Sequence, residues 1–176
     1  MQGSTYNAMQ ILTKFFHTTG KIYPSSDRPL TLHAVFTDGA EVIGESHIAG
    51  YKEMIDHVYV TNTYDDQKPQ ASRKVVQTIL DSDMVVLGPG SLFTSILPNL
   101  VIEEIGQALL ETKAEVAYVC NIMTQRGETE HFTDANHVEV LHRHLGEKFI
   151  DTVLVNIESV PQEYMNSNQF DEYLVQ

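Results

Sequence analysis

The sequence predicts an α/β fold in which a parallel sheet is covered by helices on both faces. Two observations favour this class. Short, continuously apolar segments such as 84–87 are typical of strands that are buried on both faces of a parallel sheet. From residue 70 onward, such segments alternate with helical patterns of ten or more residues. This alternation indicates β-α-β units with right-handed crossovers.

The first third of the chain has a different pattern. The apolar spacing predicts one helix, and the alternation of apolar and polar residues predicts antiparallel strands. The Asp38-Gly39 pair is a turn signal between two of these strands, so they are expected to form a β-hairpin insertion. The expected elements are a helix over 4–19, a hairpin formed by 30–36 and 41–48, and a further strand over 55–60.

Apolar spacing also predicts the remaining elements. The expected helices cover 71–80, 100–111 and 135–145, and the expected strands cover 84–87, 115–120 and 152–155. We interpret the chain as a single domain, 1–176, with a helix and hairpin region (1–66), βα repeats that carry the ligand loops (67–156), and a polar, helical tail (157–176).

Composition limits the partners. The chain has 11 Lys and Arg against 24 Asp and Glu residues, a formal net charge of −13. Such a field repels nucleic-acid backbones, and no apolar segment is long enough to span a membrane. The beginning of the chain lacks the pattern of a secretory signal, and a single cysteine forms no internal disulfide. We therefore expect a cytoplasmic protein that binds neither nucleic acid nor membrane.

The first candidate ligand loop follows the strand 84–87. In open parallel sheets, ligands bind outside the carboxyl ends of the strands. Glycines here allow the backbone to approach a ligand, hydroxyl groups offer donors, and the following helix presents its positive end to a phosphate. The alternative is a tight turn with a serine N-cap. The candidate ligand-binding residues are Gly88, Pro89, Gly90, Ser91, Thr94 and Ser95.

The second candidate loop follows the strand 115–120 and concentrates amide, hydroxyl, guanidinium and carboxylate groups. Its candidate residues are Asn121, Thr124, Gln125, Arg126, Gly127, Glu128 and Thr129. The alternative is a solvated loop in which Arg126 pairs with Glu128. Consecutive parallel strands joined by one crossover are usually neighbours, so both loops are expected to lie at one edge of the sheet.

The histidines and the cysteine give no independent site. His142 and His144 are two residues apart on a predicted helix and point to different faces, so they cannot chelate one ion. No metal site is expected. His131 is the only histidine in a candidate loop and is held as a candidate acid or base. Cys120 at a strand end is interpreted as a small buried hydrophobic residue.

The stretches VVLGPGSLFTSILPN (85–99) and YVCNIMTQRGET (118–129) closely resemble the bacterial gluconeogenesis factors, whose superfamily includes the 2-phospho-L-lactate transferases of deazaflavin coenzyme synthesis. The resemblance continues through Leu32-His33-Ala34, Gly44-Glu45-Ser46 and 151–156. It implies a Rossmann-like three-layer fold. The Gly90-Ser91 pair is similar to the regulatory branch rather than to the transferase branch.

The resemblance also implies a function. It points to a regulatory protein that binds a small anionic nucleotide-type ligand, namely a UDP-sugar such as UDP-N-acetylglucosamine, and that serves carbon metabolism and cell shape. A group transferase of the 2-phospho-L-lactate transferase type is the alternative. A nicotinamide-binding oxidoreductase is a third hypothesis, which rests on fold analogy alone. Whether catalysis occurs stays open. Self-association into a homo-oligomer is also compatible with the sequence.

The same family begins with a strand and a GGGTG loop that this sequence lacks, and its members continue beyond the point where this sequence stops. We therefore expect a fragment that is incomplete at both ends.

Overall fold

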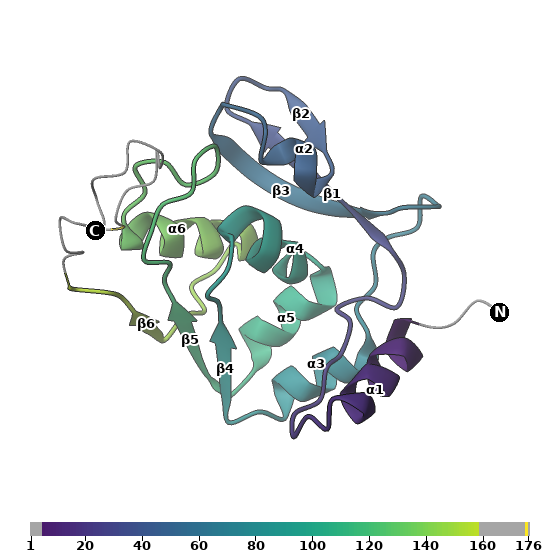
Figure 1. Ribbon diagram of the computed structural model, residues 1–176. Helices are drawn as coiled ribbons and strands as arrows, with labels where there is room; N and C mark the ends of the chain where they lie inside the picture. The colour runs from purple at the N-terminus through teal and green to yellow at the C-terminus, as the bar shows by residue number, and fades with distance from the viewer. Residues whose placement is uncertain (1–4, 159–174, 176) are drawn as a thin grey trace.

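The computed structural model describes residues 5–158 and 175. Figure 1 shows two sheets with helices between and around them. In chain order the elements are α1 (Thr5–Phe15), β1 (Leu30–Phe36), β2 (Glu41–Ile43), α2 (Glu45–Ile48), β3 (Ile55–Asn62), α3 (Arg73–Leu80), β4 (Met84–Leu87), the π-helix η1 (Leu92–Ile96), α4 (Leu97–Leu100), α5 (Glu103–Glu111), β5 (Glu115–Val119), α6 (Asp134–Leu145) and β6 (Thr152–Leu154).

The first sheet is antiparallel and has the strand order β2-β1-β3. The β1–β2 hairpin pairs Ala34 with Val42, which confirms the predicted hairpin insertion. Ala34 and Phe36 of β1 are buried, because alternate side chains of the strand face the helices. The helix α4 lies next to this sheet, beneath it in Figure 1.

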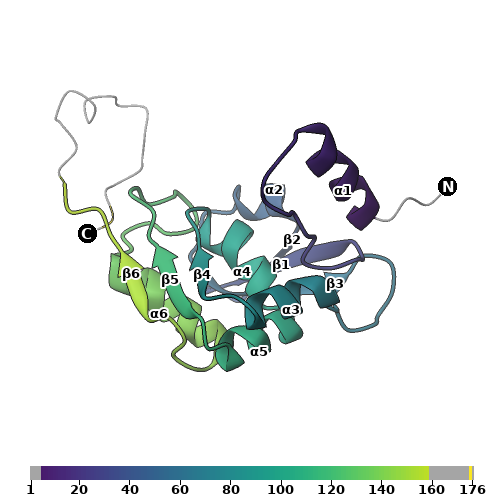
Figure 2. The same ribbon diagram turned by 90° about the horizontal axis from the view of Figure 1, so that it is seen from below.

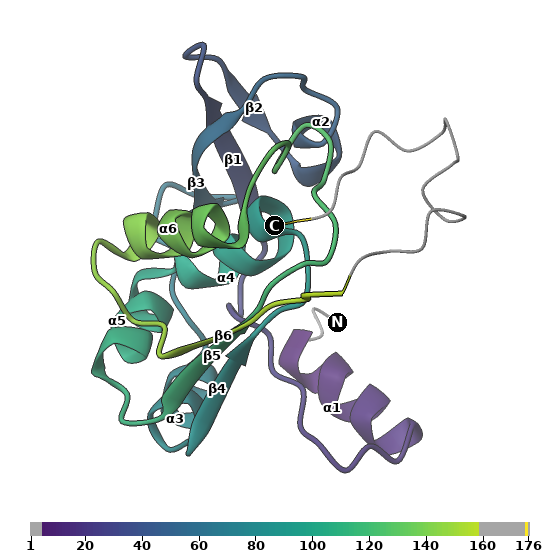
Figure 3. The same ribbon diagram turned by 90° about the vertical axis from the view of Figure 1, so that its left-hand side faces the viewer.

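The second sheet is parallel and has the strand order β4-β5-β6. Its register pairs Val86 with Ala117 and Tyr118 with Val153. The helices α3, α5 and α6 lie on one side of it (Figures 2 and 3). The α/β class and the flanked parallel sheet are thus confirmed. The three carboxyl ends point the same way and create one common edge.

The main core lies between the two sheets. Leu92, Phe93 and Leu97 of the η1–α4 segment are completely buried, as are Tyr118 of β5 and Leu141 of α6. They belong to one continuous hydrophobic cluster with residues of both sheets. Because η1 and α4 are part of this core, the loop that precedes them is held on a rigid element.

Two predicted boundaries were wrong. Residues 44–48 do not continue the hairpin strand, because Gly44 adopts φ +90° and turns the chain into α2. The connection after β4 is much shorter than expected, because helical structure starts at Leu92 rather than near Leu100. Ser91 caps this start by accepting a hydrogen bond from the amide of Thr94, and Pro98 fits near the start of α4.

Most of the predicted tail, 157–176, lies outside the described residues. In the described part of the chain, no helix combines the length and the apolar character that crossing a membrane requires.

Candidate functional site

The first candidate loop leaves the carboxyl end of β4 and enters η1. Gly88 has φ +83°, and a Cβ atom at this position would lie 2.8 Å from the carbonyl oxygen of Val119 in β5. Only glycine fits such a close approach with this backbone conformation. Pro89 follows through a cis peptide bond and is exposed. The predicted junction of strand and helical turn is confirmed.

The second candidate loop leaves the neighbouring strand β5 and lies directly beside the first. The side-chain oxygen of Asn121 accepts a hydrogen bond from the Gly90 amide at 3.3 Å, and its side-chain nitrogen donates to the Gly90 carbonyl at 2.9 Å. This two-point contact joins the loops at the sheet edge. The prediction that the two loops lie side by side is confirmed, and a shared ligand site there stays a prediction.

A buried carboxylate connects the same loops a second time. Glu128 is 2% exposed and accepts hydrogen bonds from the hydroxyl groups of Ser91 and Thr94. The Gln125 side-chain amide donates to it at 3.2 Å, and the Phe93 amide is a further donor. We call Ser91, Thr94, Gln125 and Glu128 the carboxylate cluster. It places a negative charge at the amino-terminal end of the η1–α4 segment.

Burial raises the pKa of Glu128 above the ordinary carboxyl value, whereas the Ser91 and Thr94 hydroxyl groups lower it, and the nearby charge of Glu45 raises it further. A buried carboxyl group with a perturbed pKa beside a sheet edge is a recurrent feature of functional sites. The cluster also uses the donors that the sequence assigned to a phosphate. Phosphate binding here stays a prediction, and it requires the ligand to share these donors with Glu128 or to displace it.

The other predicted residues have different placements. Gly127 has φ +76°, and a Cβ atom at this position would lie 3.0 Å from the Tyr51 carbonyl oxygen. Arg126 is exposed and lines a cavity of about 350 Å³ together with Lys52. Glu128, which the alternative pairs with Arg126, is held by the hydroxyl group of Ser91 and the side-chain amide of Gln125. Ser95 is exposed, whereas Thr124 and Thr129 are buried, and the Thr129 hydroxyl accepts a hydrogen bond from the Gln125 amide at 2.8 Å.

The sequence did not predict a cavity of about 490 Å³ next to the carboxylate cluster, which we call the hairpin cavity. It lies between β1, the beginning of α2, the end of β3 and the η1–α4 segment, and Thr94 belongs to both its lining and the cluster. The sequence signals at this cavity were the resemblances of Leu32-His33-Ala34 and Gly44-Glu45-Ser46. Because a strand was expected over 41–48, the turn at Gly44 was not predicted.

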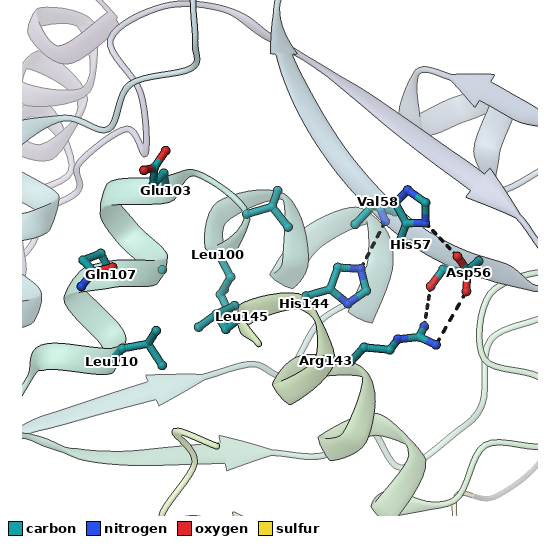
Figure 4. A pocket seen from close by; sticks show the side chains of 12 residues that line it. Asp56, His57, Val58, Leu100, Glu103, Gln107, Leu110, Arg143, His144 and Leu145 are labelled. Carbon is teal, nitrogen blue, oxygen red and sulfur yellow. Dashed lines mark hydrogen bonds and ion pairs between the residues drawn. The ribbon is translucent and has the colours of Figure 1, made fainter. Parts of the chain in front are cut away.

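A further cavity of about 590 Å³ lies on the α5–α6 side (Figure 4). Arg143 of α6 contacts Asp56 at 3.7 Å, and Nε2 of His144 accepts a hydrogen bond from the Val58 amide at 3.2 Å. These contacts hold the end of α6 against β3. Leu100 and Leu145 contribute an apolar wall. None of the predicted ligand residues lines this cavity.

Of the α6 histidines, His137 is buried and His142 and His144 are half-buried. His137 is completely buried and its Nδ1 donates to the Thr133 carbonyl at 2.8 Å. Burial lowers the pKa of His137, His142 and His144. Cys120 is 6% exposed and its pKa is raised by burial, which confirms a small buried residue rather than a thiolate.

Comparison with known proteins identifies the family. Residues 1–175 match the family described as 2-phospho-L-lactate transferase CofD. The chain belongs to this family. Within it, the chain is 82% identical over all 176 residues to a "putative gluconeogenesis factor" of Streptococcus pneumoniae and 69% identical to one of Lactococcus lactis. It is 41% identical over 161 residues to the gluconeogenesis factor of Bacillus subtilis.

Solved structures agree with this assignment. A UPF0052 family protein from Bacillus halodurans superimposes with a TM-score of 0.89 at 32% identity over 98% of this chain. The match covers 55% of that protein, 54% of the streptococcal and lactococcal relatives, and 50% of the Bacillus subtilis relative. The chain thus spans about half the length of the relatives it matches.

Proposed function

We propose that this chain is the part of a gluconeogenesis factor that binds a nucleotide-sugar, such as UDP-N-acetylglucosamine, and that the protein acts as a cytoplasmic regulator of carbon metabolism and cell shape. The observation that carries the proposal is the contact between the two loops. Gly90 and Asn121, which come from neighbouring parallel strands, form a two-point hydrogen bond at the carboxyl edge of the sheet.

The chemistry of this edge supports a phosphate-containing ligand without a large positive charge. Backbone amides and hydroxyl groups at the start of a helical segment bind anions through their partial charges. The loop from Gly88 to Ser91 supplies such groups beside the hydroxyl of Thr94. Arg126 at the exposed side of the second loop adds one cation.

A group transferase is the second candidate, and the family name is the observation that favours it. In the part of the chain that the structure describes, the loop region holds one buried carboxyl group, Glu128, and its oxygens are fully engaged with Ser91, Thr94, Gln125 and Phe93. This arrangement favours a structural carboxylate over a catalytic base, so binding without catalysis is the function we place first.

The test is calorimetric titration of the full-length protein that contains this chain with UDP-N-acetylglucosamine, with NAD and with a 2-phospho-L-lactate transferase substrate. We expect heat of binding for the UDP-sugar and no turnover. Asn121→Asp, which replaces the donor to Gly90 by a charge, should weaken binding, whereas Asn7→Asp, at an exposed asparagine of α1, is the matched control. Saturable binding of NAD alone, or product formation, would contradict the proposal.

A further inference from the structure

We propose that the cavity lined by Lys52 and Arg126 binds phosphate, either as the free ion or as part of a small phosphate ester. We call this space of about 350 Å³ the anion cavity; the backbone of Gly127 and the side chain of Glu130 also line it. The inference concerns the anion alone, so it goes beyond the proposed function and is tested without a nucleotide-sugar. The sequence predicted Arg126 and Gly127 as ligand residues, but not Lys52.

Two backbone segments that pack against each other bring the two cations together. A Cβ atom at Gly127 would lie 3.0 Å from the carbonyl oxygen of Tyr51, so the loop after β5 touches the segment that follows α2. Figure 3 shows this loop beside α2. Lys52 follows Tyr51 and Arg126 precedes Gly127, so each cation is one residue away from the contact. Both long side chains can therefore reach the same anion.

The fold holds both segments in place. The amide of Tyr51 donates to the Ile48 carbonyl at 3.1 Å, and its ring packs on Phe36 with the ring centroids 4.4 Å apart. In the loop after β5, the amide of Thr129 donates to the Gln125 carbonyl at 2.8 Å. The cations thus extend from a fixed backbone, which reduces the ordering cost of binding an anion.

The charge of the anion cavity differs from that of the whole chain. The chain has a formal net charge of −13, but two cations and one carboxylate, Glu130, line this cavity. Among the described residues that line the hairpin cavity and the cavity on the α5–α6 side, acidic side chains outnumber cations when histidine is counted as neutral. A concave surface with a positive lining attracts small anions.

Lys52 is also unusual among the cations. Arg28 pairs with Asp65 at 2.7 Å and Arg143 contacts Asp56 at 3.7 Å, whereas Lys52 has no acidic partner within the described part of the chain. Acidic residues are in excess, so a partner is easily supplied on this protein. The ammonium group instead lies in one cavity with a guanidinium group, and an anion between them lowers their mutual repulsion.

A backbone donor points to a ligand independently of charge. Gly127 is buried and lines the cavity, and its amide donates no hydrogen bond to any residue of the described part of the chain. More than about nine in ten buried backbone N–H groups in native proteins are paired, so an unpaired one marks a place for an added acceptor. An anionic oxygen in the cavity supplies this acceptor.

The three groups suit a phosphate better than other anions. A phosphate ester carries about −1.5 to −2 charges at neutral pH and has three strong acceptor oxygens. Arginine binds phosphate with two parallel hydrogen bonds, and lysine adds a point charge. A carboxylate offers one negative charge for two cations. Nucleic acids also present phosphates, but the field of a chain with a net charge of −13 repels such polyanions.

The experiment is calorimetric titration of the full-length protein with inorganic phosphate and with methyl phosphate. We expect Lys52→Gln and Arg126→Gln to bind both about three- to tenfold more weakly, the loss typical of one hydrogen bond. Glu130→Gln should bind both about two- to fivefold more tightly, because it removes a like charge from the lining. Lys113→Gln, at an exposed lysine outside the cavity, is the matched control and should keep both affinities.

The amide of Gly127 gives a second measurement. In protein labelled with ¹⁵N-glycine, its proton resonance should move downfield on addition of phosphate, because the amide gains an acceptor. The shift should saturate with the calorimetric affinity and should need a higher phosphate concentration in Arg126→Gln. A Gly127 resonance that does not respond while phosphate binds would place the anion elsewhere and overturn the inference.

The outcomes separate this inference from the proposed function. If phosphate binds with the expected losses but UDP-N-acetylglucosamine does not bind, the anion cavity stands and the proposed function fails. If neither inorganic phosphate nor methyl phosphate binds, or if Lys52→Gln and Arg126→Gln keep the original affinity, the anion cavity is wrong. When the expected losses occur, tighter binding of methyl phosphate identifies an ester as the ligand, and the reverse order identifies the free ion.

Discussion

The hydroxyl group of Ser91 donates a hydrogen bond to the carboxylate of Glu128, 37 residues further along the chain. One partner caps the helical segment after β4, and the other lies in the loop after β5. A charged acceptor at this point satisfies several donors at once, so the geometry of both loops depends on a single buried side chain.

Replacing Glu128 by alanine should therefore destabilise the protein. The donors of Ser91 and Gln125 would lose their acceptor, and a buried unsatisfied polar group costs about 1–3 kcal/mol. We expect the free energy of unfolding to fall by about 2 kcal/mol or more in urea denaturation. Glu147→Ala, at an exposed glutamate, is the control and should stay close to the unmodified protein. Equal stability of both variants would show that the cluster contributes nothing.

The stability should also depend on pH through Glu128. Burial raises its native pKa above the ordinary 4.5, so between these two values the native state binds more protons than the unfolded chain. Stability is then highest below pH 4.5 for this group and decreases as the pH rises through the native pKa. The difference in unfolding free energy between the unmodified protein and Glu128→Gln, measured from pH 4 to 8, should show this decrease. Parallel curves would contradict it.

Much of the architecture was predictable because it depends on local pattern. The apolar segment 84–87 and the Asp38-Gly39 turn carry their structure in a few neighbouring residues. The start of η1 was not predictable from its neighbouring residues. The hydroxyl-rich sequence there suggests a loop, but the burial of Leu92 and Phe93 against both sheets stabilises a helix. Tertiary packing determined that boundary.

The candidate site was predictable only in part, for a related reason. That the two loops meet follows from the parallel order of β4 and β5. That Glu128 turns inward, and that Glu45 reaches the space beside Thr94, depends on long-range contacts that sequence spacing does not encode. The same residue types in a loop are compatible with a ligand contact or with a structural hydrogen bond.

Two glycines of the first loop should respond differently to substitution. Gly88→Ala places a methyl group 2.8 Å from the Val119 carbonyl at φ +83°, so it should cost about 2 kcal/mol or more. Gly90→Ala places its methyl group 3.6 Å from the Ser95 side chain, an ordinary contact, and should cost less than about 1 kcal/mol. Denaturant unfolding of both variants checks this order. A reversed order would mean that the loop conformation differs from the one described.

His144 should make the protein less stable in mild acid. Its Nδ1 donates to the Val140 carbonyl at 2.8 Å, so Nε2 accepts the Val58 amide in the neutral form. Burial lowers its pKa; Arg143 and His57 add to this effect and Asp56 opposes it. The unfolded chain then binds a proton that the native state does not, and stability is lost as the pH falls from about 6.5 through the native pKa.

The expected slope for one such group is at most about 1.4 kcal/mol per pH unit. Urea denaturation between pH 7.5 and 5 should show the loss in the unmodified protein and a shallower loss in His144→Gln. His47→Gln, at an exposed histidine, is the control and should keep the original slope. If both variants keep it, another group governs the acid response.

The final prediction concerns the exposed face of the parallel sheet. Met84 and Val86 of β4 and Leu154 of β6 are 52%, 54% and 54% exposed, although both faces of parallel sheets are normally covered. An apolar surface of this kind favours association, so we expect the chain to self-associate at increasing concentration. The double variant Met84→Thr, Val86→Thr places a β-branched polar residue at both positions, and should weaken association while changing stability by less than about 0.5 kcal/mol. Val85→Thr, one residue away but facing the core, should leave association unchanged and lower stability by about 1–2 kcal/mol.

Sedimentation velocity over a concentration series measures this association. Association that is equal in the double variant, or a chain that stays monomeric throughout, would show that this face is not a contact surface.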